Sequence, residues 1–176
     1  TSNKKPKPFV LKAKNVYGSN MNYKLVNENK ENIVVYAALK GGGDLQNMVL
    51  EGSTFSSQIN GLYFTDSYGL KVSSLTTDFL YSPTGMYAKK ANLITKTSDI
   101  KGDVVFDYNR GDLNDFLNKV NIKANFSKSK ISVEDVKNYY TELSGNDLVY
   151  FNGNLNGSLN NFRVNGLNLT SKKGIE

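Results

Sequence analysis

The chain has 176 residues, of which 39% are hydrophobic, and it carries a formal net charge of +6 with no cysteine and no histidine. This length and apolar content suffice for one domain with a hydrophobic core, although two small domains fit the same length. Disulfides, the Ser-His and Cys-His catalytic arrangements and nearly all zinc sites depend on the two missing side chains. We therefore expect a protein that is not an enzyme and that binds neither a cofactor nor a metal.

Carboxylates are the remaining candidates for catalysis. Such acids would have to converge on one site. The five candidates are scattered through polar, turn-like sequence, at Asp99, Asp103, Asp107, Asp112 and Asp115. This setting favours structural or solubilising roles for them.

The positive charge comes almost entirely from lysine, because Arg110 and Arg163 are the two arginines of the chain. Nucleic-acid recognition relies heavily on the bidentate guanidinium group, and the lysines are spread along the sequence. The exception is KKPKP within residues 1–8, which predicts an extended basic segment. We expect weak attraction to anionic surfaces such as lipid headgroups, and no nucleic-acid partner.

No run approaches the ~20 apolar residues that a membrane-spanning helix needs, and no signal-peptide pattern is present. The first residue is Thr1 rather than methionine. We therefore expect a fragment of a longer or processed protein, with any membrane anchor outside this sequence.

Alternation of apolar and polar residues with a period of two predicts strands along most of the chain. The turn sequence Ser82-Pro83-Thr84-Gly85 predicts a hairpin between the runs that flank it. In chain order, the predicted strands lie at residues 9–13, 21–25, 33–39, 55–64, 70–74, 75–81, 86–95, 100–108, 120–126 and 148–155.

One pattern occurs twice, at Gly43–Phe55 and Gly157–Leu169, with matching glycine, leucine and asparagine positions. A repeat this short predicts a strand, a turn and a second strand that must pack on neighbours. Two segments depart from strand periodicity. Residues 111–118 are compatible with a helical turn, and residues 133–143 predict a helix with Ser132 and Asp135 as a capping-box variant and Gly145 at its end.

Together these patterns predict a mainly β fold, an extended antiparallel sheet with one short helix around 133–143, in a single domain at residues 9–176. A sheet of roughly ten strands usually curls or folds over. Its apolar face must be covered by a second layer, by the helix or by an apolar ligand. If the face is an open groove, it binds acyl chains at about 0.8 kcal/mol per methylene. The predicted lining residues are Leu75, Phe79, Tyr81, Ile100, Val104, Phe106, Val120, Ile122, Ala124, Phe126, Val149, Phe151 and Leu155.

Four segments, at residues 11–32, 69–108, 118–143 and 153–169, resemble the AsmA-like superfamily of the bacterial envelope, most closely its TamB (translocation and assembly module) branch. In that family an element of the type G-x-L-x-N-F-x-V-x-G-L-x-L recurs, as in GSLNNFRVNGLNL here. The resemblance implies a curled, groove-forming sheet called a β-taco. It also implies a periplasmic protein of a diderm bacterium, anchored in the inner membrane by a segment absent here.

The resemblance further implies phospholipid transport between the inner and outer membranes, and support of outer-membrane protein assembly through a barrel partner that contacts regions outside this fragment. Two alternatives remain open. One is a structural β module of an envelope or surface protein, with a filled core and no bound lipid. The other is a protein-interaction platform that offers a sheet edge to an extended peptide.

Overall fold

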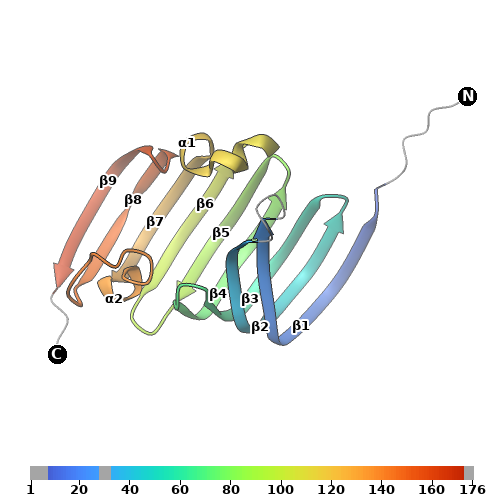
Figure 1. Ribbon diagram of the computed structural model, residues 1–176, viewed down its shortest axis with the longest axis horizontal. Helices are drawn as coiled ribbons and strands as arrows, with labels where there is room; N and C mark the ends of the chain where they lie inside the picture. The colour runs from blue at the N-terminus through green and yellow to red at the C-terminus, as the bar shows by residue number, and fades with distance from the viewer. Residues whose placement is uncertain (1–7, 28–32, 173–176) are drawn as a thin grey trace, which may run out of the picture.

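A computed structural model describes residues 8–27 and 33–172 of the chain. Within these residues the fold is one antiparallel sheet in which every strand pairs with its neighbours in sequence, in the order β1 to β9 (Figure 1). The sheet does not close on itself, so β1 and β9 are its two edges. The predicted mainly β, extended and curled antiparallel sheet is therefore confirmed. The strands are β1 (Val10–Asn27), β2 (Ile33–Glu51), β3 (Thr54–Asp66), β4 (Lys71–Ser82), β5 (Gly85–Ile94), β6 (Asp99–Asp107), β7 (Asn121–Ser132), β8 (Leu148–Ser158) and β9 (Asn161–Lys172).

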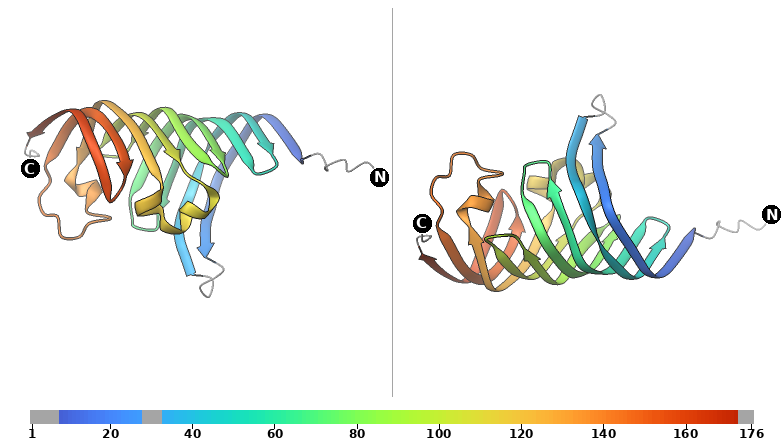
Figure 2. Two further views of the ribbon diagram at one scale, coloured as in Figure 1. Left: turned by 90° about the horizontal axis from the view of Figure 1, so that it is seen from above. Right: turned by 90° about the horizontal axis from the view of Figure 1, so that it is seen from below.

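Short helical segments lie over the strand ends on one face of the sheet, and we call these two ends of the face its rims. The 3-10 helix η1 (Arg110–Asp115) and helix α1 (Phe116–Lys119) follow β6, and helix α2 (Val133–Val136) follows β7. Figure 2 shows these segments on the concave side of the curved sheet. Within the described residues, no second sheet or long helix forms a layer over that face.

The sheet curves where its strands contain β-bulges. Asn47, Lys90 and Lys128 have positive φ angles of 52°, 51° and 46° inside β2, β5 and β7, and the pairing register shifts at each of them. Gly61 and Gly166 have the same backbone conformation inside β3 and β9. A bulge adds one residue to one strand of a pair, which bends and twists the sheet locally. A bulge in most of the strands therefore explains the curl.

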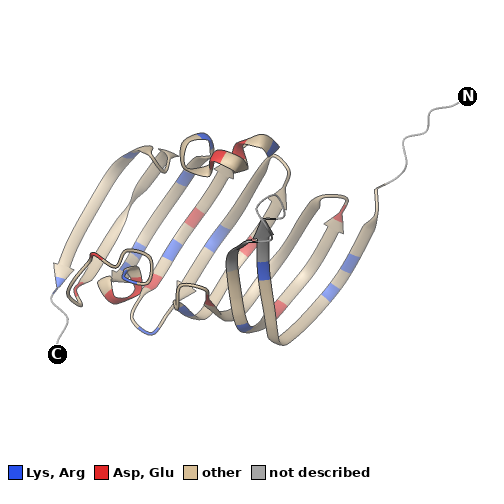
Figure 3. Ribbon diagram, viewed as in Figure 1, with Lys and Arg blue, Asp and Glu red and all other residues tan. Residues whose placement is uncertain are grey.

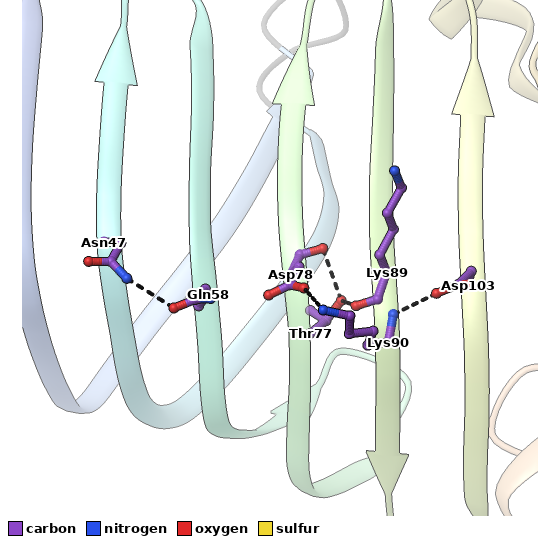
Figure 4. A network of polar contacts seen from close by, with 7 residues as sticks. All are labelled: Asn47, Gln58, Thr77, Asp78, Lys89, Lys90 and Asp103. Atoms are coloured by element: carbon purple, nitrogen blue, oxygen red, sulfur yellow. Dashed lines mark hydrogen bonds and ion pairs between the residues drawn. The ribbon is translucent and has the colours of Figure 1, made fainter.

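Polar side chains replace part of the backbone pairing at the bulges. The Thr77 hydroxyl donates to the carbonyl oxygen of Lys89 at 2.9 Å, and the Lys90 amide donates to the Asp103 carboxylate at 2.6 Å. Buried Ser57 and Ser129 likewise donate to carbonyl oxygens of the neighbouring strand. Figure 4 shows the first two contacts together with the Asn47–Gln58 hydrogen bond and the Asp78–Lys90 ion pair. The bonds made by Ser57, Thr77, Asp103 and Ser129 supply partners to backbone groups at the bulges.

The predicted helix at 133–143 was too long, because α2 ends at Val136. Ser132 caps it as predicted, accepting a hydrogen bond from the Glu134 amide. Asp135 does not complete a capping box, since its carboxylate turns to the loop at residues 95–98. After Val136 the chain continues in single turns, in which the Tyr139 amide donates to the Val136 carbonyl oxygen and the Leu143 amide to the Tyr140 carbonyl oxygen. The helical turn predicted at 111–118 falls on η1 and α1.

The two copies of the repeat do not form the same local structure. In the first copy, Gly52 has a φ of +56° in the turn between β2 and β3. The matching Gly166 has a φ of +62° inside β9, and the turn of the second copy lies earlier, at residues 159–160. Both positions need a residue that tolerates positive φ, and the shared glycine reflects this need. The hairpin predicted at Ser82–Gly85 is confirmed. The predicted basic segment at residues 1–8 lies outside the described residues except for Pro8.

Candidate functional site

The concave face of the sheet is a continuous apolar surface. Pairing aligns Phe79 with Ala88, Ala88 with Val104, Val104 with Ala124, and Ala124 with Leu155. Residues directly opposite each other on neighbouring strands point to the same face. The row therefore crosses five strands on one side of the sheet. Parallel rows hold the remaining predicted lining residues, which are Leu75, Tyr81, Ile100, Phe106, Val120, Ile122, Phe126, Val149 and Phe151.

The rim under α1 is tightly packed. Val120 is 0% exposed and Tyr108 and Ile122 are each 6% exposed. Phe116 of α1 packs on Phe106, with ring centroids 6.0 Å apart. Burial raises the pKa of Tyr108, with a smaller contribution from nearby Tyr81, and the phenol donates to the Ser82 carbonyl oxygen at 2.9 Å. At this rim the apolar face forms an ordinary filled core.

The rim under α2 contains a partly open cavity of about 250 Å³. Its floor comes from the ends of β5, β6 and β7, and its roof is α2 with the turn that follows. The apolar lining residues are Leu70, Leu93, Ile100, Ile131, Val136 and Tyr139, and the polar ones are Thr95, Ser98 and Asp135.

Hydrogen bonds fix the α2 roof to the sheet. The Oδ2 atom of Asp135 accepts from the hydroxyls of Thr95, Thr97 and Ser98 at 2.5, 2.9 and 2.5 Å. On the other side of the roof, the Tyr139 hydroxyl donates to the Asp66 carboxylate at the end of β3. The roof is thus held from two directions.

A second cavity, of about 180 Å³, lies between β7, β8 and β9. Phe126 and Phe151 meet there edge to face at 5.5 Å, beside Leu155, Val164 and Leu167. All twelve residues of β9 are exposed, so this end of the groove has no outer wall. The apolar surface therefore continues to the β9 edge of the sheet.

The middle of the groove is only half-buried. Phe79 meets Phe55 with ring centroids 6.1 Å apart, and Tyr81 is 38% exposed. Leu75 lies between Leu62 and Leu93 on the neighbouring strands. These half-exposed side chains fit a single-layer sheet, because no second layer covers them within the described residues.

The five acids considered for catalysis do not converge. Asp99, Asp103 and Asp107 lie on the convex face, where Asp99 and Asp107 form ion pairs of 2.8 Å with Lys101 and Lys123. Asp112 and Asp115 hydrogen-bond locally within η1 and α1, to Asn109 and Asn118 respectively. Figure 3 shows the charged residues scattered along the sheet rather than gathered into one cluster. Among the described residues, no group of three or more acids could hold a metal ion.

Sequence reasoning missed Leu93, Ile131 and Leu167, which line the two cavities. Each follows a bulge in its strand, at Lys90, Lys128 and Gly166. An extra residue shifts the alternation by one position. Side chains after the bulge therefore point to the face opposite to the one that uninterrupted alternation predicts. A glycine inside an apolar strand pattern was the available signal in β9. The lysine bulges have no comparable signal.

Comparison with known proteins identified no relative, because no family model, no curated protein and no solved structure matches the chain. In the described part of the chain, no helix is long and apolar enough to cross a membrane.

Proposed function

We propose that the chain is a non-enzymatic module of the bacterial cell envelope that carries phospholipid acyl chains along its concave groove, between the inner and outer membranes. The observation that carries this proposal is an apolar row across β4 to β8, over whose middle the described residues form no second layer. The resemblance to the AsmA-like superfamily supports the same role and a periplasmic location. Support of outer-membrane protein assembly would require regions outside this sequence.

Simple energetics favours an acyl chain as the ligand. Each methylene that leaves water contributes about 0.8 kcal/mol, so ten of them contribute about 8 kcal/mol before the entropic cost of binding is subtracted. Such binding needs no specific polar contact. The headgroup can remain in water outside the groove.

Native mass spectrometry with lipid extraction, on protein purified from a bacterial envelope, tests this proposal. Phe79 and Leu80 are adjacent and comparably buried, yet they point to opposite faces of β4. We expect bound phospholipid in the unaltered protein, its loss in Phe79→Asp, and its retention in the matched control Leu80→Asp. Circular dichroism checks that both variants remain folded. A folded protein that never carries lipid would point instead to the structural alternative.

A second function is favoured by the β9 edge. Phe162, Val164 and Leu169 are 48%, 40% and 59% exposed on β9, which pairs with β8 on one side, has no partner strand on the other among the described residues, and contains no proline. Such an edge can accept an extended peptide by β-augmentation. Val164→Pro removes an amide from this edge and should abolish peptide binding, whereas Val164→Ala keeps the amide. Equal binding by both variants, measured by fluorescence anisotropy, argues against this function.

A further inference from the structure

We propose that the cavity under α2 receives the methyl end of a bound acyl chain and thereby sets the longest chain that the groove accepts. This inference rests on the proposed function of the groove, and it assigns a distinct task to one of its ends.

The size and lining of the cavity suit a hydrocarbon. Its volume of about 250 Å³ is larger than that of a ~150 Å³ apolar cavity that binds benzene. Six apolar side chains, from three strands, the loop before β4 and the roof, form most of the wall. An empty space of this kind loses contacts on every side, which a flexible chain would restore.

The polar atoms at the wall are already paired. Asp135, the one charged group in the lining, faces the loop at residues 95–98 and accepts three hydroxyl donors there. The Thr95 oxygen also accepts from the Ser98 amide at 2.8 Å, and the Ser98 oxygen accepts from the Ser132 amide at 2.9 Å. A polar headgroup placed here would lose its water without finding equivalent partners. The end of the ligand that enters is therefore the methyl end.

The cavity is continuous with the floor of the groove. Leu93 and Ile100 line it and pair with each other, and Leu93 also pairs with Leu75 in the middle of the face. Beyond the cavity, the roof is fixed by Asp135 on one side and by Tyr139 bonded to Asp66 on the other. A chain that slides along the groove toward this rim thus meets the fixed roof.

The test is a series of saturated fatty acids of increasing length, titrated by displacement of a fluorescent fatty acid. Affinity should rise about fourfold per methylene while the chain extends into the cavity, and should stop rising once it is filled. Val136→Phe narrows the cavity from the roof. It should end the rise at a chain about two methylenes shorter, so that the longest chains bind about sixteenfold more weakly. Short chains should bind as before.

Two further variants make the result decisive. Val10→Phe is the matched control, because Val10 is 46% exposed on β1, far from the cavity. Leu93→Ala enlarges the cavity and should move the limit toward longer chains, which keeps the test valid if Val136→Phe does not fold. If the limiting length is the same in all folded variants, the inference is wrong while the proposed function stands. If the unaltered protein binds no fatty acid, the proposed function itself fails.

Discussion

The two rims of the groove differ in how tightly their apolar side chains are packed. Under α1, the segment after β6 inserts Phe116 against Phe106, and Val120 is fully buried. Under α2, the segment after β7 forms a roof held by the hydrogen bonds of Asp135, and a cavity of about 250 Å³ remains below it. The α1 rim carries η1 and α1, and the α2 rim carries α2 alone.

The difference lies in what each segment presents to the sheet. The α1 segment presents an aromatic ring, which fills space and excludes water. The α2 segment presents a carboxylate that spans to three hydroxyls, which fixes its position while leaving the apolar floor uncovered. One rim thus supplies stability to the sheet, and the other supplies an unfilled space. The following predictions test this division.

Truncation of one apolar side chain at each rim should give the largest difference in the free energy of unfolding. Ile122→Ala removes a side chain that is 6% exposed in the packed cluster, and should lower the free energy of unfolding by about 3 kcal/mol. Ile100→Ala removes the same atoms beside the existing cavity, where fewer contacts are lost, and should cost about half as much. Urea unfolding measures both. Equal losses would mean that the two rims are equally packed.

Removing the Asp135 carboxylate should destabilise the α2 rim and leave the α1 rim unchanged. Asp135→Ala leaves three hydroxyls without their acceptor and should cost about 2 kcal/mol. Amide hydrogen exchange should accelerate at residues 95–98 and in α2, while the α1 rim keeps its protection. Asp112→Ala is the control at the other rim, where the carboxylate bonds an exposed asparagine, and its effect on the α2 rim should be nil.

The buried phenol should make the α1 rim sensitive to alkali. The pKa of Tyr108 is raised above 10.0, mainly by burial, because the folded state favours the neutral form. Its contribution to stability is therefore complete below pH 10.0 and is lost as the pH rises through the raised pKa of the folded state. Tyr108→Phe should cost about 1 kcal/mol at neutral pH, through the lost hydrogen bond to Ser82, and should flatten the decline above pH 10.0. Unfolding curves at several pH values would show an unchanged slope if Tyr108 is not responsible.

The smallest expected change in stability is at the bulges, which bend the sheet between the two rims. Lys128 has a φ of 46° and is exposed, so Lys128→Gly relieves backbone strain and should raise the free energy of unfolding by about 0.5 kcal/mol. Lys123 lies in the same strand and is absent from the residues with positive φ. Lys123→Gly should therefore destabilise the protein. Thermal unfolding of the two variants gives the comparison, and the same sign for both would contradict it.

Alternation predicted the middle of the sheet well, because periodicity of two maps directly onto the two faces of a regular strand. Val104, Phe106, Ile122 and Ala124 all precede the bulges in their strands or lie in strands without one, and all lie on the predicted face. The α1 rim follows from the same pattern, since Tyr108 and Val120 extend these runs to the ends of their strands.

The α2 rim could not be predicted in this way. Lysine at positive φ is uncommon, so nothing in the sequence indicates that Lys90 and Lys128 reverse the phase of the residues after them. The α2 roof is held by Asp135, which reaches a loop about forty residues away in sequence. A cavity results from the balance of such long-range contacts, and no local pattern encodes that balance.

Photocrosslinking from single positions tests the central claim, that acyl chains bind on the concave face, most directly. A benzophenone amino acid replaces Phe79 or Leu155 on the concave face, or Gln58 or Asn125 on the convex face. The purified variants are irradiated with phospholipid, and mass spectrometry detects the adducts. The account predicts lipid adducts at Phe79 and Leu155 and none at Gln58 and Asn125. Equal labelling of both faces, or no labelling of the concave face, would contradict it.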